Sequence, residues 1–409
     1  MKIQQIRALE ILDSRGKPTL QAEVRLSDGT RAVAQVPSGA STGRHEALEL
    51  RDGEARYAGQ GVRQAVRNVE ETLGPAVLQM NAADQAGIDR RLRETDGTPD
   101  KSRLGANAIL AISCAVARAA AMSRGIPLWR HLAGDRTPLL PVPMVNILSG
   151  GLHAGRNLEF QDFLVLPRGV DGLGDMLEAI VRVHATTAKL LHSRGYTLTG
   201  VADEGGWGPR LESNEQAVAL LREAIEEANA DMDIALDVAS THFHEDGFYT
   251  LEGRKRTAAE MTSVLEEWIP RYGIASIEDA LAEDDWEGWR TLTARLGKSV
   301  ALVGDDLFVT NIDRLNRGIE TGVANAVLVK MNQIGTLTET FGVIDRACEA
   351  GYTAVISARS GETEDSFLAD LAVASGAGRI KIGSITRSER LAKYNRLLEI
   401  EKWELPKAD

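Results

Sequence analysis

Three acidic residues stand at or just after the ends of short apolar runs. Asp237 and Glu278 close two such runs directly, and Asp305 follows a third run after one glycine. Runs of this kind are typical of buried strands, and the carboxyl ends of neighbouring parallel strands lie close together. Mg²⁺ prefers carboxylate oxygens as ligands. One acidic residue after a strand is often only a helix cap, but three in succession predict a magnesium site.

A lysine, Lys330, closes a fourth apolar run at residues 326–329. We expect its pKa to be lowered, because burial and a nearby cation both disfavour the ammonium form. A neutral amine can abstract a proton from the carbon next to a carboxylate, and metal ions on the carboxylate oxygens would stabilise the resulting dianion. The alternative, a surface lysine at a strand end, fits so apolar a run poorly.

Expulsion of a neighbouring hydroxyl also requires an acid. The candidate is Glu204, in the sequence DEGG at residues 203–206. The paired glycines let the backbone approach a ligand closely, and we expect neighbouring acids to raise the pKa of Glu204, as a general acid requires. A plain turn is the default interpretation of this sequence. His153, in GGLHAG, either lies with Glu204 on the side of the site that supplies the acid, called the acid side below, or caps a loop.

Further residues offer contacts for an anionic substrate. Arg359, Ser360 and Lys381 supply cationic and hydroxyl groups for a phosphate and a carboxylate. The small-residue loop SGASTG at residues 38–43 could close over a phosphate and lend a hydroxyl to a metal. Loops of this composition are more often plain turns.

The elements that must position these residues fall into two parts. Residues 1–133 have an α+β pattern, with an alternating strand at 19–26 and helices near 61–79 and 105–124. Three prolines within residues 137–143 indicate a linker. A first, α+β domain at 1–133 and a second domain at 140–409 are therefore expected.

In the second part, short apolar runs alternate with helical segments and recur about 25 to 40 residues apart. Ser213 and Gln216 form a candidate capping box that opens one of the helices. Six strand–helix units predict an α/β barrel with its chemistry at the carboxyl ends of the strands. A doubly wound open sheet is the main alternative, but it would gather the polar groups near one switch point.

Composition limits the partners and the compartment. The 409-residue chain has a formal net charge of −12 and no basic tract, which argues against nucleic acid as its main partner. Two cysteines do not make a disulfide framework, so a reducing cytoplasm is expected. The first residues lack a long apolar run, and Arg118 interrupts the most apolar stretch, so neither a signal peptide nor a membrane span is expected.

Taken together, the motifs resemble those of the enolase family over residues 3–401. The matching segments are LDSRG at 12–16, VPSGASTG at 36–43, LGANAI at 104–109, DEGG at 203–206, SIED at 276–279, GDDL at 304–307, LVKMNQIG at 328–335, RSGETED at 359–365 and RSER at 387–390.

The resemblance implies a modified (β/α)8 barrel with one early antiparallel strand, capped by the N-terminal α+β domain. It implies a hydro-lyase with two Mg²⁺ sites, a lysine base of the kind for which this superfamily is the type example, and a homodimer or higher homo-oligomer. The roles it implies are magnesium ligands at Asp237, Glu278, Asp305 and Ser41, the base at Lys330, the acid at Glu204, and substrate contacts at His153, Gln161, Arg359, Ser360 and Lys381.

Departures from the family pattern gather on the acid side. Enolases carry histidine where this chain has Ala358, and glutamate where it has Asp162. Both changes reduce side-chain volume, while the metal side and the base match the family. This combination predicts retained proton abstraction with an enlarged pocket beside the hydroxyl and phosphate. Smaller departures are Ser149, Ala202 and Ala280 in place of asparagine, glycine and proline.

Three functions follow from these observations. The favoured hypothesis is a specialised relative that eliminates water from a substituted 2-phosphoglycerate, like the carboxyphosphonoenolpyruvate synthase of phosphonate antibiotic biosynthesis. The second is an ordinary glycolytic enolase that converts 2-phosphoglycerate to phosphoenolpyruvate. The third is a non-catalytic relative used for binding or structure. The third predicts decay across the whole site, and the site argues against it because it keeps Asp237, Glu278, Asp305, Lys330 and Glu204.

Overall fold

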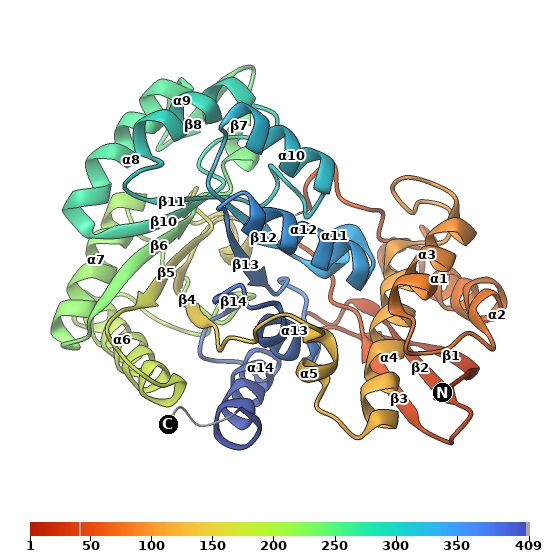
Figure 1. Ribbon diagram of the computed structural model, residues 1–409. Helices are drawn as coiled ribbons and strands as arrows, with labels where there is room; N and C mark the ends of the chain where they lie inside the picture. The colour runs from red at the N-terminus through yellow and green to blue at the C-terminus, as the bar shows by residue number, and fades with distance from the viewer. Residues whose placement is uncertain (41, 406–409) are drawn as a thin grey trace.

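An antiparallel sheet of three strands begins the chain in the computed structural model, which describes residues 1–40 and 42–405. The strands are β1 (Ile3–Leu12), β2 (Pro18–Leu26) and β3 (Arg31–Gln35). Leu20, Ala22, Val24 and Leu26 of β2 are fully buried, as their alternation predicted. The sheet packs against α4 (Ala106–Arg124), and these red-to-orange elements stand beside the barrel in Figure 1.

The predicted helix near residues 61–79 is divided in the structure. It comprises α1 (Arg63–Asn68), η2 (Val69–Leu73) and α2 (Gly74–Val77). Pro75 in the first turn of α2 has no N–H, and this position tolerates that loss. The remaining elements of this part are η1 (Arg56–Gly59), α3 (Gln85–Asp96) and α5 (Leu128–Ala133).

Eight strands close into a barrel, so the predicted barrel with an N-terminal cap is confirmed and the open sheet is excluded. One strand, β5, runs antiparallel to both of its neighbours, and the other pairs are parallel. The strands are β4 (Val142–Ser149), β5 (Asp162–Pro167), β6 (Met232–Asp237), β10 (Ile274–Glu278), β11 (Ala301–Gly304), β12 (Ala326–Val329), β13 (Thr353–Ser357) and β14 (Arg379–Gly383).

Helices surround the barrel, as Figure 1 shows. At the start of α7, Ser213 caps the helix by accepting from the amide of Gln216 at 3.1 Å, as predicted. The Gln216 side chain accepts from the backbone amide of Glu212 and not from that of Ser213. The second hydrogen bond of a capping box is therefore not formed at this described helix start. The helices are α6 (Leu173–Ser193), α7 (Asn214–Glu227), α8 (Ala258–Tyr272), α9 (Trp286–Leu296), α10 (Ile312–Thr321), α11 (Met331–Ile334), α12 (Leu337–Glu349), α13 (Phe367–Ser375) and α14 (Ser388–Glu399).

Short elements complete the chain around the barrel. A small hairpin sheet follows β6, and single helical turns lie after β4, after β6 and after α14. They are η3 (Gly151–Ala154), η4 (Ser240–Phe243), β7 (His244–Glu245), β8 (Phe248–Leu251), β9 (Arg254–Arg256) and η5 (Ile400–Glu404).

A separate apolar cluster with members on six barrel strands lies below the polar strand ends. Its residues are Met144, Leu164, Leu166, Ala235, Val303, Ala326, Leu328 and Val355. This closely packed apolar layer supports the charged side chains at the strand ends and excludes water from beneath them.

Helix α4 is long and apolar enough to cross a membrane by those two measures alone. In the described residues, however, 83% of its most apolar window is buried inside the protein. A core helix of a globular domain has this property.

Candidate active site

Lys381, on β14, places its ammonium between two of the carboxylates predicted to bind metal. Its Nζ lies 2.8 Å from Oδ2 of Asp237 and 2.7 Å from Oε2 of Glu278. All three side chains are buried. Burial and the neighbouring charge of Asp237 raise the pKa of Glu278 well above its usual range. Burial acts to raise the pKa of Asp237, but the surrounding cations, Lys381 foremost and then His153 and Lys330, together lower it. Both carboxylates therefore favour a nearby cation.

Lys330 follows β12 and faces the third predicted metal ligand. Its Nζ lies 2.5 Å from Oδ2 of Asp305, whose Oδ1 accepts a hydrogen bond from Gln333 at 2.9 Å. The expectation of a lowered Lys330 pKa is wrong for this arrangement. Burial is the largest single influence and acts to lower the pKa, but the charges of the nearby carboxylates, Asp305 foremost and then Glu278, together raise it. The ammonium form is favoured until another cation takes up the charge of Asp305.

Asp279, which sequence reasoning did not single out as a site residue, fixes the loop that carries Asp305. Its two carboxylate oxygens accept hydrogen bonds from the backbone amides of Asp305 and Asp306, at 2.9 and 2.8 Å. Its own backbone has a φ of +43°, a conformation that L residues rarely adopt. The strain and the two bonds indicate that this loop is built for a defined placement of Asp305.

The donor chemistry of the strand ends fits a divalent cation. Asp237, Glu278 and Asp305 end or follow three adjacent strands, β6, β10 and β11, and offer hard oxygen atoms. With their lysine partners in place they do not form one tight ligand group. Among the described residues the tight groups are His153, Asp162 and Glu204, and Asp279, Asp305 and Asp306. The assignment of the metal ligands, including Ser41, which lies outside the described residues, stays a prediction.

His153, on η3, lies on the acid side of the barrel mouth rather than in a loop cap. Its Nδ1 is 2.9 Å from Oδ2 of Asp162, and its Nε2 is 3.7 Å from Oε1 of Glu204. Burial acts to lower the pKa of His153, but the charges of Asp162 and Glu204 raise it to about 9. The second oxygen of Asp162 accepts from Asn146 and Ser149. The imidazole is thus held as a cation between two carboxyl groups.

The expectation of a raised pKa for Glu204 is wrong. Burial acts in that direction, but the charge of His153, followed by that of Arg390, lowers the pKa of this carboxyl. Sequence reasoning counted only neighbouring acids and missed these cations. At neutral pH, therefore, His153 carries a proton and Glu204 is ionised.

Arg359 and Ser360 follow β13 and contact the N-terminal loop. The Arg359 guanidinium donates to both carboxylate oxygens of Glu46, at 3.0 and 3.1 Å, and to Asn332 at 2.8 Å. The Ser360 hydroxyl accepts from the backbone amide of Ala40 at 2.7 Å. Glu46 was missed because nothing in the local sequence indicates that a loop of the first domain reaches the barrel mouth.

The side chain of Gln161 contacts one of the predicted metal ligands. Its Nε2 donates to Oδ2 of Asp237 at 3.3 Å, while its Oε1 is buried and has no hydrogen-bond partner within residues 1–40 and 42–405. A buried acceptor of this kind costs free energy unless a ligand group donates to it. The structure thus brings together all the predicted site residues that it describes.

Comparisons with known proteins agree with this geometry. The model of the enolase N-terminal domain matches residues 3–132, and that of the enolase C-terminal TIM barrel domain matches residues 137–408. The chain belongs to the enolase family. It is 54% identical to an enolase of Acidothermus cellulolyticus over 404 residues, which cover 98% of this chain and 94% of that protein. Like other enolases it is a carbon–oxygen lyase of the hydro-lyase type.

The two main departures from the enolase pattern have different surroundings. Asp162 is fully buried and bound to His153, Asn146 and Ser149, so its shorter side chain is compensated by close partners. Ala358 is buried at the end of β13, and its backbone amide donates to the carbonyl of Lys381 at 2.8 Å. A methyl group stands there where other enolases have an imidazole.

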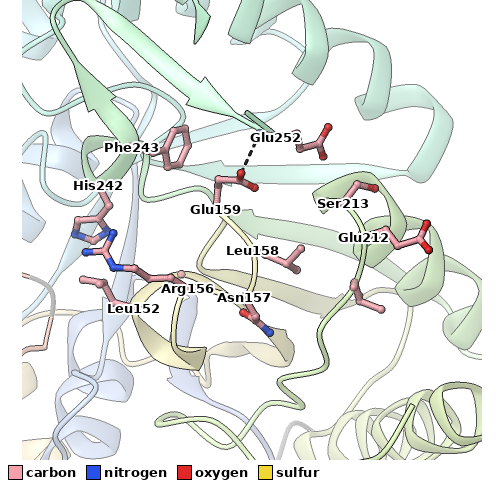
Figure 2. Close-up of a pocket in the computed structure, with 12 residues that line it drawn as sticks. Leu152, Arg156, Asn157, Leu158, Glu159, Glu212, Ser213, His242, Phe243 and Glu252 are labelled. Carbon is pink, nitrogen blue, oxygen red and sulfur yellow. Dashed lines mark hydrogen bonds between the residues drawn. The ribbon is translucent and has the colours of Figure 1, made fainter. Parts of the chain in front are cut away.

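A cavity of about 340 Å³ lies beside this enolase site, next to η3. Figure 2 shows Arg156 and His242 together near Leu152, while Glu212 and Ser213 lie on the other side. The dashed line in Figure 2 marks the hydrogen bond of 2.9 Å that the backbone amide of Glu252 donates to Oε1 of Glu159. Neither Ala358 nor Asp162 lines this cavity.

Proposed function

We propose that this enzyme eliminates water from 2-phosphoglycerate and forms phosphoenolpyruvate, as an ordinary enolase. The observation that carries the proposal is the division of the barrel mouth into two sides. Lys330 and three carboxylates lie on one side, and the His153–Glu204 pair lies on the other. The similarity to a relative named enolase over nearly the whole chain supports the unsubstituted substrate.

The metal side provides the base. Mg²⁺ held by Asp237, Glu278 and Asp305 would stabilise the negative charge that develops on the substrate carboxylate, and Ser41 would serve a second ion. Once Asp305 no longer pairs with Lys330, the buried amine can lose its proton and take the proton from carbon 2 of the substrate. The electrons of the broken C–H bond then pass toward the carboxylate.

The acid side completes the elimination. The C3–O bond breaks with its electron pair on oxygen, and the departing hydroxide must receive a proton to leave as water. Glu204 would hand over this proton, and His153, which lies 3.7 Å away and whose pKa is raised to about 9, would supply Glu204 with it. The carbon–carbon double bond of the product forms in the same step.

The substrate anions need fixed cationic partners. Arg359 and Ser360 are assigned to the phosphate, which would compete with Glu46 for the guanidinium. Lys381 is assigned to the carboxylate end, because it lies among the metal-side carboxylates. Gln161 would accept a hydrogen bond from the substrate through its unpaired Oε1.

A second candidate function is the same elimination on a 2-phosphoglycerate that bears a substituent, as in the carboxyphosphonoenolpyruvate synthase type of enzyme. The specific observation is Ala358, buried beside Arg359 and Lys381, where the smaller side chain leaves room at the phosphate and hydroxyl end. We place this candidate second because the overall similarity is to an enolase.

Absorbance of phosphoenolpyruvate, followed with purified protein, Mg²⁺ and 2-phosphoglycerate, tests the proposal. We expect turnover on the order of 10 s⁻¹ or more, the median for enzymes. Slow or absent turnover by a protein that binds Mg²⁺ and remains folded would contradict the unsubstituted substrate and favour the second candidate.

A further inference from the structure

Arg390, on α14, is a fully buried cation that contacts neither the predicted metal ligands nor the predicted base. Its guanidinium donates to three backbone carbonyls: Nη1 to Arg359 at 2.6 Å and to Ile382 at 2.8 Å, and Nη2 to Ser360 at 2.7 Å. Arg359 and Ser360 follow β13, whereas Ile382 belongs to β14. One side chain thus ties the phosphate-side segment to the neighbouring strand end.

The same strand end holds the acid loop. The amide of Ser384 donates to the carbonyl of Glu204 at 2.8 Å, and Thr386 donates to the carbonyl of Gly205 at 2.7 Å. Gly383 has a φ of +115°, and a Cβ there would lie 2.9 Å from the Glu204 carbonyl and 3.0 Å from Cδ of Arg390. The acid loop and Arg390 therefore both crowd the position that a Cβ would take at Gly383, which leaves room only for glycine.

The chemistry of the side chain matters for this arrangement. Burying a guanidinium costs free energy unless well-oriented hydrogen-bond acceptors surround its N–H groups. Only arginine has a planar fork with five donors, which can reach three carbonyls at once; a lysine ammonium is a single point. The charge of Arg390 also contributes to lowering the pKa of Glu204.

We propose that Arg390 is a positioning residue, which sets the phosphate-side segment Arg359–Ser360 and the acid loop around Glu204 at the separation that the elimination requires. The inference rests on the proposed function for the meaning of that separation. Arg390 acts through the backbone of these segments and does not itself touch the substrate.

The test compares Arg390→Lys with Arg396→Lys. Arg396 lies on the same helix and pairs with Asp370 and Glu404, away from the barrel mouth, so the same substitution there controls for damage to α14. Steady-state kinetics with 2-phosphoglycerate and backbone hydrogen–deuterium exchange are measured for both variants, and Arg390→Gln is a second variant that removes the charge.

We expect Arg390→Lys to lower kcat by about 10²-fold, the effect of a misplacement of about 1 Å, and to raise KM severalfold. Exchange should accelerate at residues 358–361 and 203–206, and Arg396→Lys should show neither change. Equal kinetics and exchange in the two lysine variants would overturn the proposal. So would a failure of both Arg390 variants to fold, because Arg390 would then serve the fold rather than the site. If 2-phosphoglycerate is no substrate of the wild type, the proposed function fails, and the exchange comparison still decides the role of Arg390.

Discussion

Nδ1 of His153 lies 2.9 Å from Oδ2 of Asp162, and this contact keeps the imidazole charged at neutral pH. The histidine faces Glu204 with its other nitrogen. In the proposed function, the acid is therefore the pair of His153 and Glu204 and not a single carboxyl with a raised pKa.

The pH dependence of kcat follows from this pair. Because the pKa of His153 is raised to about 9, we expect kcat to fall as the pH rises through about 9. Replacing Asp162 by Asn removes the largest charge that raises this pKa, so the alkaline limb should move to lower pH. A pH profile of kcat at saturating substrate for both proteins checks this. An unmoved alkaline limb in Asp162→Asn would contradict the assignment of that limb to His153.

The raised pKa of His153 also affects the free energy of unfolding. The folded state binds the proton of His153 more tightly than the unfolded chain, whose histidine has a pKa of about 6.5. This stabilisation is therefore complete below about pH 6.5 and is lost as the pH rises to about 9. Urea unfolding at a series of pH values should show a smaller loss of stability across this window for His153→Asn than for the wild type. An identical loss in both proteins would contradict the raised pKa.

Removal of divalent metal should abolish activity reversibly. Asp237 and Glu278 lie at adjacent strand ends as buried carboxylates that favour a cation. Glu278→Gln should therefore raise the Mg²⁺ concentration for half-maximal activity by tenfold or more, on the order of the effect of losing one metal contact. Asp345→Asn, at an exposed ion pair with Arg136, is the matched control and should leave it unchanged. Full activity after chelation would exclude a metal role.

Ala358 provides a direct comparison of the two candidate substrates. If unsubstituted 2-phosphoglycerate is the natural substrate, the site already suits it, and Ala358→His should change kcat/KM by no more than a few-fold. A gain of tenfold or more, which is about 1.4 kcal/mol in transition-state binding, would show that the wild-type pocket is shaped for a larger substrate. Thermal unfolding of the variant controls for strain from the added imidazole.

Much of this site could be predicted because its signals are local. Asp237, Glu278 and Lys330 each end a short apolar run, and that pattern alone places them at the carboxyl ends of barrel strands. The antiparallel direction of β5 followed from the family resemblance, since no pattern within Asp162–Pro167 indicates it.

The ionisation of the site could not be predicted in the same way. Whether a buried group gains or loses its proton depends on which charges lie within a few ångströms, and these come from distant parts of the chain. Asp305 and other carboxylates reverse the expected pKa shift of Lys330, and His153 and other cations reverse that of Glu204. Glu46 illustrates the same limit, because it reaches Arg359 from 313 residues away in the sequence.

In the proposed function, Lys330 takes the proton from carbon 2, while Glu204 protonates the leaving group. Solvent deuterium exchange at carbon 2 of 2-phosphoglycerate, measured by NMR beside product formation, separates the two steps. We predict that Lys330→Ala loses both exchange and product formation, by about 10²- to 10⁴-fold. Glu204→Gln should retain exchange and lose product formation. Undiminished exchange in Lys330→Ala would contradict the role of Lys330 as the base.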